Sequence, residues 1–125
     1  MAAPIARIKN RPTSVVVSCE AGAVADNLVY LDPAADESVL VAADNRTPTP
    51  VVGIIVSKPT ATTAEVVLLG EVSLSIGRGH LYVGSSGEVS LSGTTVSGEY
   101  LQRIGFSLGS GRIYFNPSQL RTRRN

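Results

Sequence analysis

The chain has 125 residues, the usual size of one domain, and its apolar residues are mainly Val, Leu and Ile, with few aromatic side chains and no Trp. The single Cys excludes an intrachain disulfide, and one Cys with one His cannot supply the three or four such ligands of a zinc site. No apolar run approaches the roughly 20 residues that a membrane-spanning helix needs, so we expect a soluble protein made in a cytoplasm, with no membrane partner.

The formal net charge is only +1, but the charges are unevenly distributed. Every charged residue from 20 to 44 is acidic, whereas both ends of the chain are basic. This pattern favours ends that contact another subunit or an anionic surface; the alternative is that both ends are solvated and have no partner. The basic residues of the two ends are Arg7, Lys9, Arg11, Arg121, Arg123 and Arg124.

Residues 1–13 are predicted to form an N-terminal arm. Pro4 and Pro12 discourage a helix there. In an extended arm the three cations at alternate positions project to one side, and such an arm can add itself to the sheet edge of a neighbouring chain. Its candidate interaction residues are Ile5, Arg7, Ile8, Lys9 and Arg11.

From residue 14 onward, short β-branched or alternating runs are separated by turn residues, and no apolar repeat at helical spacing is sustained. We therefore predict an all-β domain over 14–117, a small antiparallel barrel or sandwich with short hairpins and extended terminal arms, followed by a basic tail at 118–125. Its strands are expected at 14–18, 28–32, 39–43, 51–57, 64–76 with a bend at Gly70, 81–83, 88–91, 99–108 and 112–117.

The stretch "GSSG" (84–87) is glycine-rich, which raises the question of a phosphate-binding loop. Such a loop needs a helix after it. The following residues "EVSLSG" alternate with period two, which predicts a strand instead. Gly84 and Gly87 permit the positive φ of a tight hairpin turn, so we interpret the stretch as a turn.

The sequence offers no catalytic constellation. His80, the one candidate base, is expected on the surface of a turn, and Cys19 is expected to pack as a small apolar residue near a strand end. The acidic residues of 32–37 do not follow the calcium-loop pattern and are expected to be solvated. We therefore predict a protein that is not an enzyme and that uses no metal or other cofactor.

Two further expectations concern the C-terminal strands. Arg103 and Arg112 are placed on adjacent strands, where they can pair with Glu99 or Glu88 or with another subunit. An RNA-binding sheet would expose aromatic side chains beside basic residues, but the aromatic residues here alternate with core-like residues, so we expect them to pack. They are Tyr82, Tyr100, Tyr114 and Phe115.

From about residue 21 to 117, the order of features resembles that of capsid decoration (cement) proteins and related small β-modules of tailed phages. The resemblance is carried by "AGAVADNLVYLD", then "PVVGIIVS", then "VVLLGEVSLSIGRGHLYVGSSGEVS" and finally "GEYLQRIGFSLGSGRIYFNPS". The matched positions are mostly turn glycines and core apolar residues, so the resemblance transfers no functional residue, and the basic N-terminal arm lies outside it.

The resemblance implies a compact β module that assembles as a homotrimer on the capsid surface, binds the major capsid protein, stabilises the phage head and catalyses nothing. Its location would be the virion. Two alternatives stay open: a tail-fibre or baseplate adhesin module that binds glycan or a receptor, and a nucleic-acid-binding β-barrel that uses the Arg-rich end. Nucleic acid is the least favoured of these partners.

Overall fold

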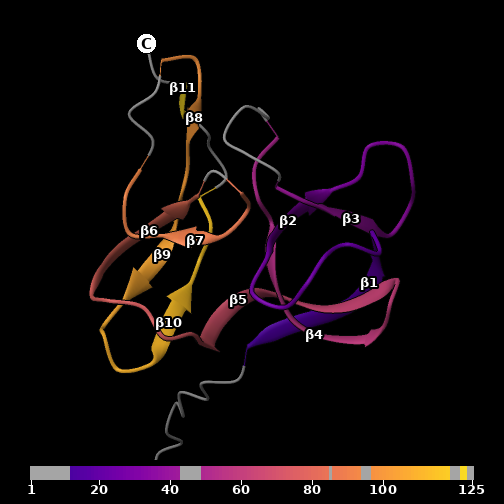
Figure 1. The fold of residues 1–125 in the computed structure, drawn as a ribbon, viewed down its shortest axis with the longest axis horizontal. Coiled ribbons are helices and arrows are strands. Elements are labelled where there is room, and N and C mark those ends of the chain that lie inside the picture. Colours follow the sequence, from indigo (N-terminus) through magenta and orange to yellow (C-terminus); the bar gives the residue numbers. More distant parts are fainter. Residues whose placement is uncertain (1–11, 43–48, 85, 94–96, 119–121, 124–125) are drawn as a thin grey trace, which may run out of the picture.

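The computed structural model describes residues 12–42, 49–84, 86–93, 97–118 and 122–123 (Figure 1). All regular secondary structure in these ranges is β, which confirms the predicted all-β class. The described ranges contain no helix long and apolar enough to cross a membrane. The strands are β1 (Thr13–Cys19), β2 (Leu28–Leu31), β3 (Ser38–Val41), β4 (Gly53–Thr60), β5 (Thr63–Ser73), β6 (Gly79–Val83), β7 (Val89–Ser90), β8 (Tyr100–Leu101), β9 (Arg103–Ser107), β10 (Arg112–Phe115) and β11 (Thr122–Arg123).

The first five strands form a ring of pairings in the order β1-β3-β2-β4-β5, and β5 pairs back with β1. Four of these five pairings are antiparallel. The fifth, between β1 and β3, is parallel and joins only Ser18 to Ser38 and Cys19 to Val39. The expected antiparallel arrangement therefore has one exception, and the ring is closed at one end of β1 only.

A second sheet continues from the far end of β5 through β10, β9 and β6 to β7. In Figure 1 the ring strands β1–β4 lie on one side of the molecule and β6, β7, β9 and β10 on the other, with β5 running between them. The pair β8–β11 forms a separate two-stranded sheet. The segment 118–125, expected as a tail, thus contributes a short strand that pairs with β8.

Two hydrophobic cores lie on opposite faces of the shared strands. The smaller core draws its members from all five ring strands and fills the ring. The larger core joins the outside of the ring to the second sheet. Because successive strand residues point to opposite faces, Val66 of β5 belongs to the smaller core and its neighbour Val67 to the larger one.

The long strand β5 bends at Gly70, as predicted. Gly70 has φ +124°, a conformation that side chains with Cβ rarely adopt. Before the bend β5 pairs with β1 and β4, and from Gly70 onward it pairs with β10. The bend therefore lets one strand belong to both sheets.

The "GSSG" stretch is a hairpin turn, as predicted. The Gly84 N–H donates to the Glu88 carbonyl at 2.7 Å, and β6 and β7 pair on either side. Gly87 has φ +82°, and its carbonyl accepts a hydrogen bond from the Leu28 N–H at 2.8 Å. The turn therefore also attaches the second sheet to the ring.

Replacing Gly87 with Ala should destabilise the protein more than replacing Gly111 with Ala. Both glycines have φ +82°, and this backbone conformation costs a residue with Cβ about 1–2 kcal/mol. A Cβ on Gly111 meets nothing within 4 Å, whereas a Cβ on Gly87 would lie 2.6 Å from the Ala42 carbonyl oxygen. Urea unfolding of the two variants measures the difference. Equal losses would show that the ring and the turn are not in close contact at Gly87.

Candidate interaction surfaces

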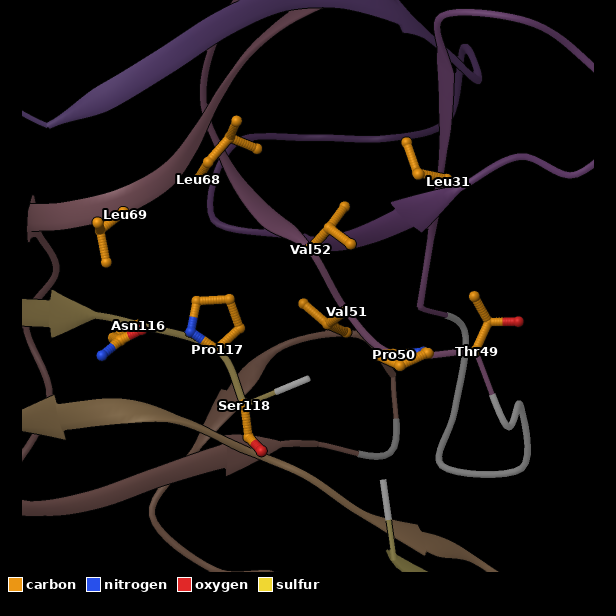
Figure 2. Close-up of a pocket in the computed structure, with 10 residues that line it drawn as sticks. All are labelled: Leu31, Thr49, Pro50, Val51, Val52, Leu68, Leu69, Asn116, Pro117 and Ser118. Carbon is orange, nitrogen blue, oxygen red and sulfur yellow. The ribbon is translucent and has the colours of Figure 1, made fainter. Parts of the chain in front are cut away.

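An apolar groove of about 610 Å³ lies where β5 changes partners (Figure 2). Leu68 and Leu69 stand between the last residue of β5 that pairs with β4, Val67, and the first that pairs with β10, Gly70. Figure 2 shows Leu31, Val52 and Leu68 on one side of the groove and residues 116–118 on the other. We call this hollow the apolar groove; it is lined by Leu31, Thr49, Pro50, Val51, Val52, Leu68, Leu69, Asn116, Pro117 and Ser118.

A buried amide holds two of the groove's segments together. The side chain of Gln102 is 1% exposed. Its Oε1 accepts a hydrogen bond from the Val51 N–H at 2.8 Å, and its Nε2 donates to the Val51 carbonyl at 3.0 Å and to the Ser118 carbonyl at 2.6 Å. Gln102 thus pairs with Val51 as a neighbouring strand would, and it satisfies both backbone groups of this buried residue.

The segment after β10 is also fixed by its backbone. The Asn116 N–H donates to the Ile104 carbonyl at 2.8 Å, and the Ser118 N–H donates to the Arg103 carbonyl at the same distance. One wall of the groove is therefore attached to β9, while the opposite wall belongs to the ring. Because both walls belong to hydrogen-bonded frameworks, the groove is a candidate binding surface whose shape is already fixed.

The chemistry of the groove is that of a docking surface. None of its ten lining residues carries an ionisable side chain, and its polar side chains are two hydroxyls and one amide. Leu31 and Leu69 leave 59% and 45% of their surface exposed. Exposed Leu side chains beside Pro and Val favour an apolar partner, because their burial removes apolar surface from water.

A second surface lies on the outer face of the second sheet. Strand register aligns His80, Phe106, Tyr114 and Glu71 in one row across β6, β9, β10 and β5. The rings of Phe106 and Tyr114 are nearly parallel, at 6°, with centroids 5.6 Å apart. We call these four residues the aromatic row. A solvated sheet face is ordinarily polar, so exposed stacked rings there are a candidate contact surface.

Two expectations about this face are corrected. Tyr114 was expected to pack, but it is 45% exposed, because odd-numbered residues of β10 face the core and even-numbered ones face outward. Phe106, which the sequence pattern did not single out, is 41% exposed beside it.

Arg112 pairs with Glu71 across the β5–β10 ladder at 2.7 Å, rather than with Glu99 or Glu88. The Arg112 side chain is 58% exposed, so solvent screens the pair and the pair adds little stability.

Most of the candidate residues at the two ends lie outside the described residues: Ile5, Arg7, Ile8, Lys9, Arg11, Arg121 and Arg124. Arg123 belongs to β11, where its backbone is paired opposite Tyr100; the description does not extend to its side chain. The arm's attachment point is described: Pro12 immediately precedes β1 and packs against Gly70.

Of the remaining candidates, Cys19 lies apart from both surfaces and His80 belongs to the aromatic row. Cys19 is buried in the smaller core at the end of β1, as predicted. His80 is exposed, as expected, but belongs to strand β6 and to the aromatic row. Within the described ranges, no group of three His, Cys, Asp or Glu side chains is placed to hold a metal ion.

The sequence contains one signal for the groove, the amide of Gln102. The alternation of 99–108 places Gln102 on the same side as Ile104, which is a core position. An amide at an inward strand position indicates a buried hydrogen-bonding role. Its partners, 51 and 16 residues away, follow only from the tertiary structure.

Comparisons with known proteins add no family: no protein-family model matches the chain, and no curated protein matches it.

Replacing Gln102 with Ala should cost about 2–3 kcal/mol of unfolding free energy, because it removes the side-chain partner of the N–H and carbonyl groups of Val51, a residue that is 1% exposed. Replacing the exposed groove residue Asn116 with Ala should change stability by less than about 0.5 kcal/mol. Denaturant unfolding of both variants provides the measurement. If the two losses are similar, Gln102 does not hold the groove together.

Proposed function

We propose that this chain is a non-enzymatic structural protein of a phage virion, a capsid decoration protein that binds the shell as a homotrimer. It is made in the host cytoplasm and acts on the capsid surface, where its partners are further copies of itself and the major capsid protein. The observation that carries the proposal is the apolar groove: a preformed hollow without ionisable side chains, flanked by exposed Leu31 and Leu69.

The composition of the surface supports this role. Strands and turns rich in Val, Ser, Thr and Gly present short side chains, which lose little rotamer entropy when they dock. A module repeated over a lattice also gains from multivalency, because contacts that are weak singly become strong collectively. A protein that holds shell units together needs such contacts and needs no acid, base or nucleophile.

Binding to empty shells of the phage that encodes the chain tests the proposal. The protein should sediment with preformed shells and should raise their resistance to heat, and a cryo-electron microscopy map should show it at lattice junctions. In the absence of shells, sedimentation equilibrium at micromolar concentration should show self-association. A protein that stays monomeric and leaves the shells bare would refute the proposal.

Deleting residues 2–11 should weaken shell attachment or self-association while leaving the melting temperature nearly unchanged. The deletion removes the basic arm but ends before β1, so both hydrophobic cores keep all their members. Thermal unfolding and shell co-sedimentation at fixed salt measure the two effects. If the shortened chain decorates and self-associates as well as the full chain, the arm has no part in attachment.

The aromatic row favours one second candidate, an adhesin module that binds glycan. Sugar rings stack on aromatic side chains, and the carboxylate, guanidinium and imidazole groups of Glu71, Arg112 and His80 can hydrogen-bond to hydroxyls. Shallow hollows of about 310 and 110 Å³ border Phe106. The row thus has both the apolar and the polar elements of a saccharide subsite.

Binding to host surface polysaccharide distinguishes this candidate from the first. If the row is a glycan site, Phe106→Ala and Tyr114→Ala should each reduce binding at least about tenfold, which corresponds to 1.4 kcal/mol. Val16→Ala, which changes an exposed residue of β1, should leave binding unchanged. Absence of polysaccharide binding by the unaltered chain would eliminate the adhesin candidate.

A further inference from the structure

We propose that the apolar groove of one copy binds the apolar segment 2–6 (AAPIA) of the N-terminal arm of a second copy, so that copies are linked by exchanged arms. This inference rests on the self-association that the proposed function includes. It assigns to that association a specific contact between residues 2–6 of one copy and the apolar groove of the other.

Pro12, the described residue from which the arm extends, lies next to an acidic hollow. Pro12 packs against Gly70: a Cβ on Gly70 would lie 2.8 Å from the Pro12 Cα. Pro12 also lines a separate hollow of about 260 Å³ that includes Asp26, Glu65 and Glu71. The base of the arm is therefore next to three carboxylates.

The order of residues in the arm matches these two surfaces. The charged side chains of the arm, Arg7, Lys9 and Arg11, all lie in the half nearest to Pro12, whereas residues 2–6 have no charged side chain. The cations next to Pro12 complement the carboxylates of the hollow at its base. The uncharged segment complements a groove that has no ionisable lining residue.

The length of the arm favours a groove on another copy. Leu69, a wall of the chain's own groove, is adjacent to Gly70, the residue against which Pro12 packs. Extended backbone covers about 3.3 Å per residue, so six residues out from Pro12 the segment 2–6 begins about 20 Å away. To reach its own groove the arm would have to reverse over residues 7–11, which contain no Gly and no Asn-Gly or Asp-Gly turn pair.

Docking of the segment would bury apolar side chains that are now exposed. Leu31 and Leu69 are among the large apolar side chains that the described surface leaves exposed, and both flank the groove. A segment with Pro4 and Ile5 offers apolar surface with little backbone freedom to lose, since proline fixes its own φ and restricts the residue before it. Docking therefore covers apolar surface on both copies at a modest entropic cost.

Cysteine cross-linking between two singly substituted full-length proteins tests the contact. Ala3→Cys protein carrying a mass tag is mixed with untagged Leu31→Cys protein, allowed to exchange, and oxidised. The native Cys19 is buried and interferes little. The expected result is a mixed disulfide between one tagged and one untagged chain. Because each chain carries one introduced Cys, this product can form only between two copies, and its rate relative to a control mixture reports whether the arm is docked in the groove.

Leu108→Cys protein replaces Leu31→Cys protein in the control mixture. Leu108 is a Leu of similar exposure, 65% against 59%, but it does not line the groove. The groove mixture should form the mixed disulfide roughly tenfold faster, reflecting the high effective concentration of a docked arm. Equal rates in the two mixtures would overturn the proposal, and so would a double variant, Ala3→Cys with Leu31→Cys, that closes its disulfide only within one chain.

A charge placed in the groove gives an independent measurement. Leu31→Asp should weaken self-association in sedimentation equilibrium at least about tenfold, whereas Leu108→Asp should not, and both variants should keep the native melting temperature because both residues are exposed. Equal effects would overturn the groove assignment. If the unaltered chain self-associates and binds shells but shows no arm–groove cross-link, this inference fails while the proposed function stands.

Discussion

The sharing of β5 between two sheets is the constraint on which the rest of the structure depends. One strand of 11 residues pairs with β1 and β4 along its first part and with β10 along its last, and its consecutive residues Val66 and Val67 enter different cores. Gly70, with φ +124°, lies where the strand changes partners, and a side chain there would clash with Pro12. The ring and the second sheet are consequently parts of one folded unit.

The groove is a consequence of the same arrangement. A strand that changes partners leaves a few residues between them, here Leu68 and Leu69, and the diverging segments 49–52 and 116–118 form the remaining walls. Backbone groups near such a divergence lack regular ladder partners, and Gln102 supplies them with its amide. The apolar hollow and the buried polar clamp therefore have one common origin, the divergence of β4 and β10 from β5.

Both candidate surfaces expose apolar side chains on a framework of β hydrogen bonds, and they differ in polarity. The groove lacks ionisable groups and suits an apolar segment, whereas the aromatic row places Glu71 and His80 beside two rings and suits a ligand with hydroxyls. The exposed edge of β1 carries Val15 and Val16 rather than charges. Surfaces of this kind are typical of proteins that act by contact with other chains.

The sequence by itself determined the all-β class, the positions of most strands, the turn at 84–87 and the bend at Gly70, because these depend on local alternation and on the backbone freedom of glycine. It also determined the opposite charge character of the ends and the 20–44 segment. Tertiary structure alone decided the parallel β1–β3 contact, the pairing of β11 with β8, the partners of Gln102 and the ion pair of Arg112 with Glu71. Each of these contacts joins residues far apart in the chain. Period-two alternation determines which face of a sheet a residue lies on. It does not determine which strand will lie beside that residue.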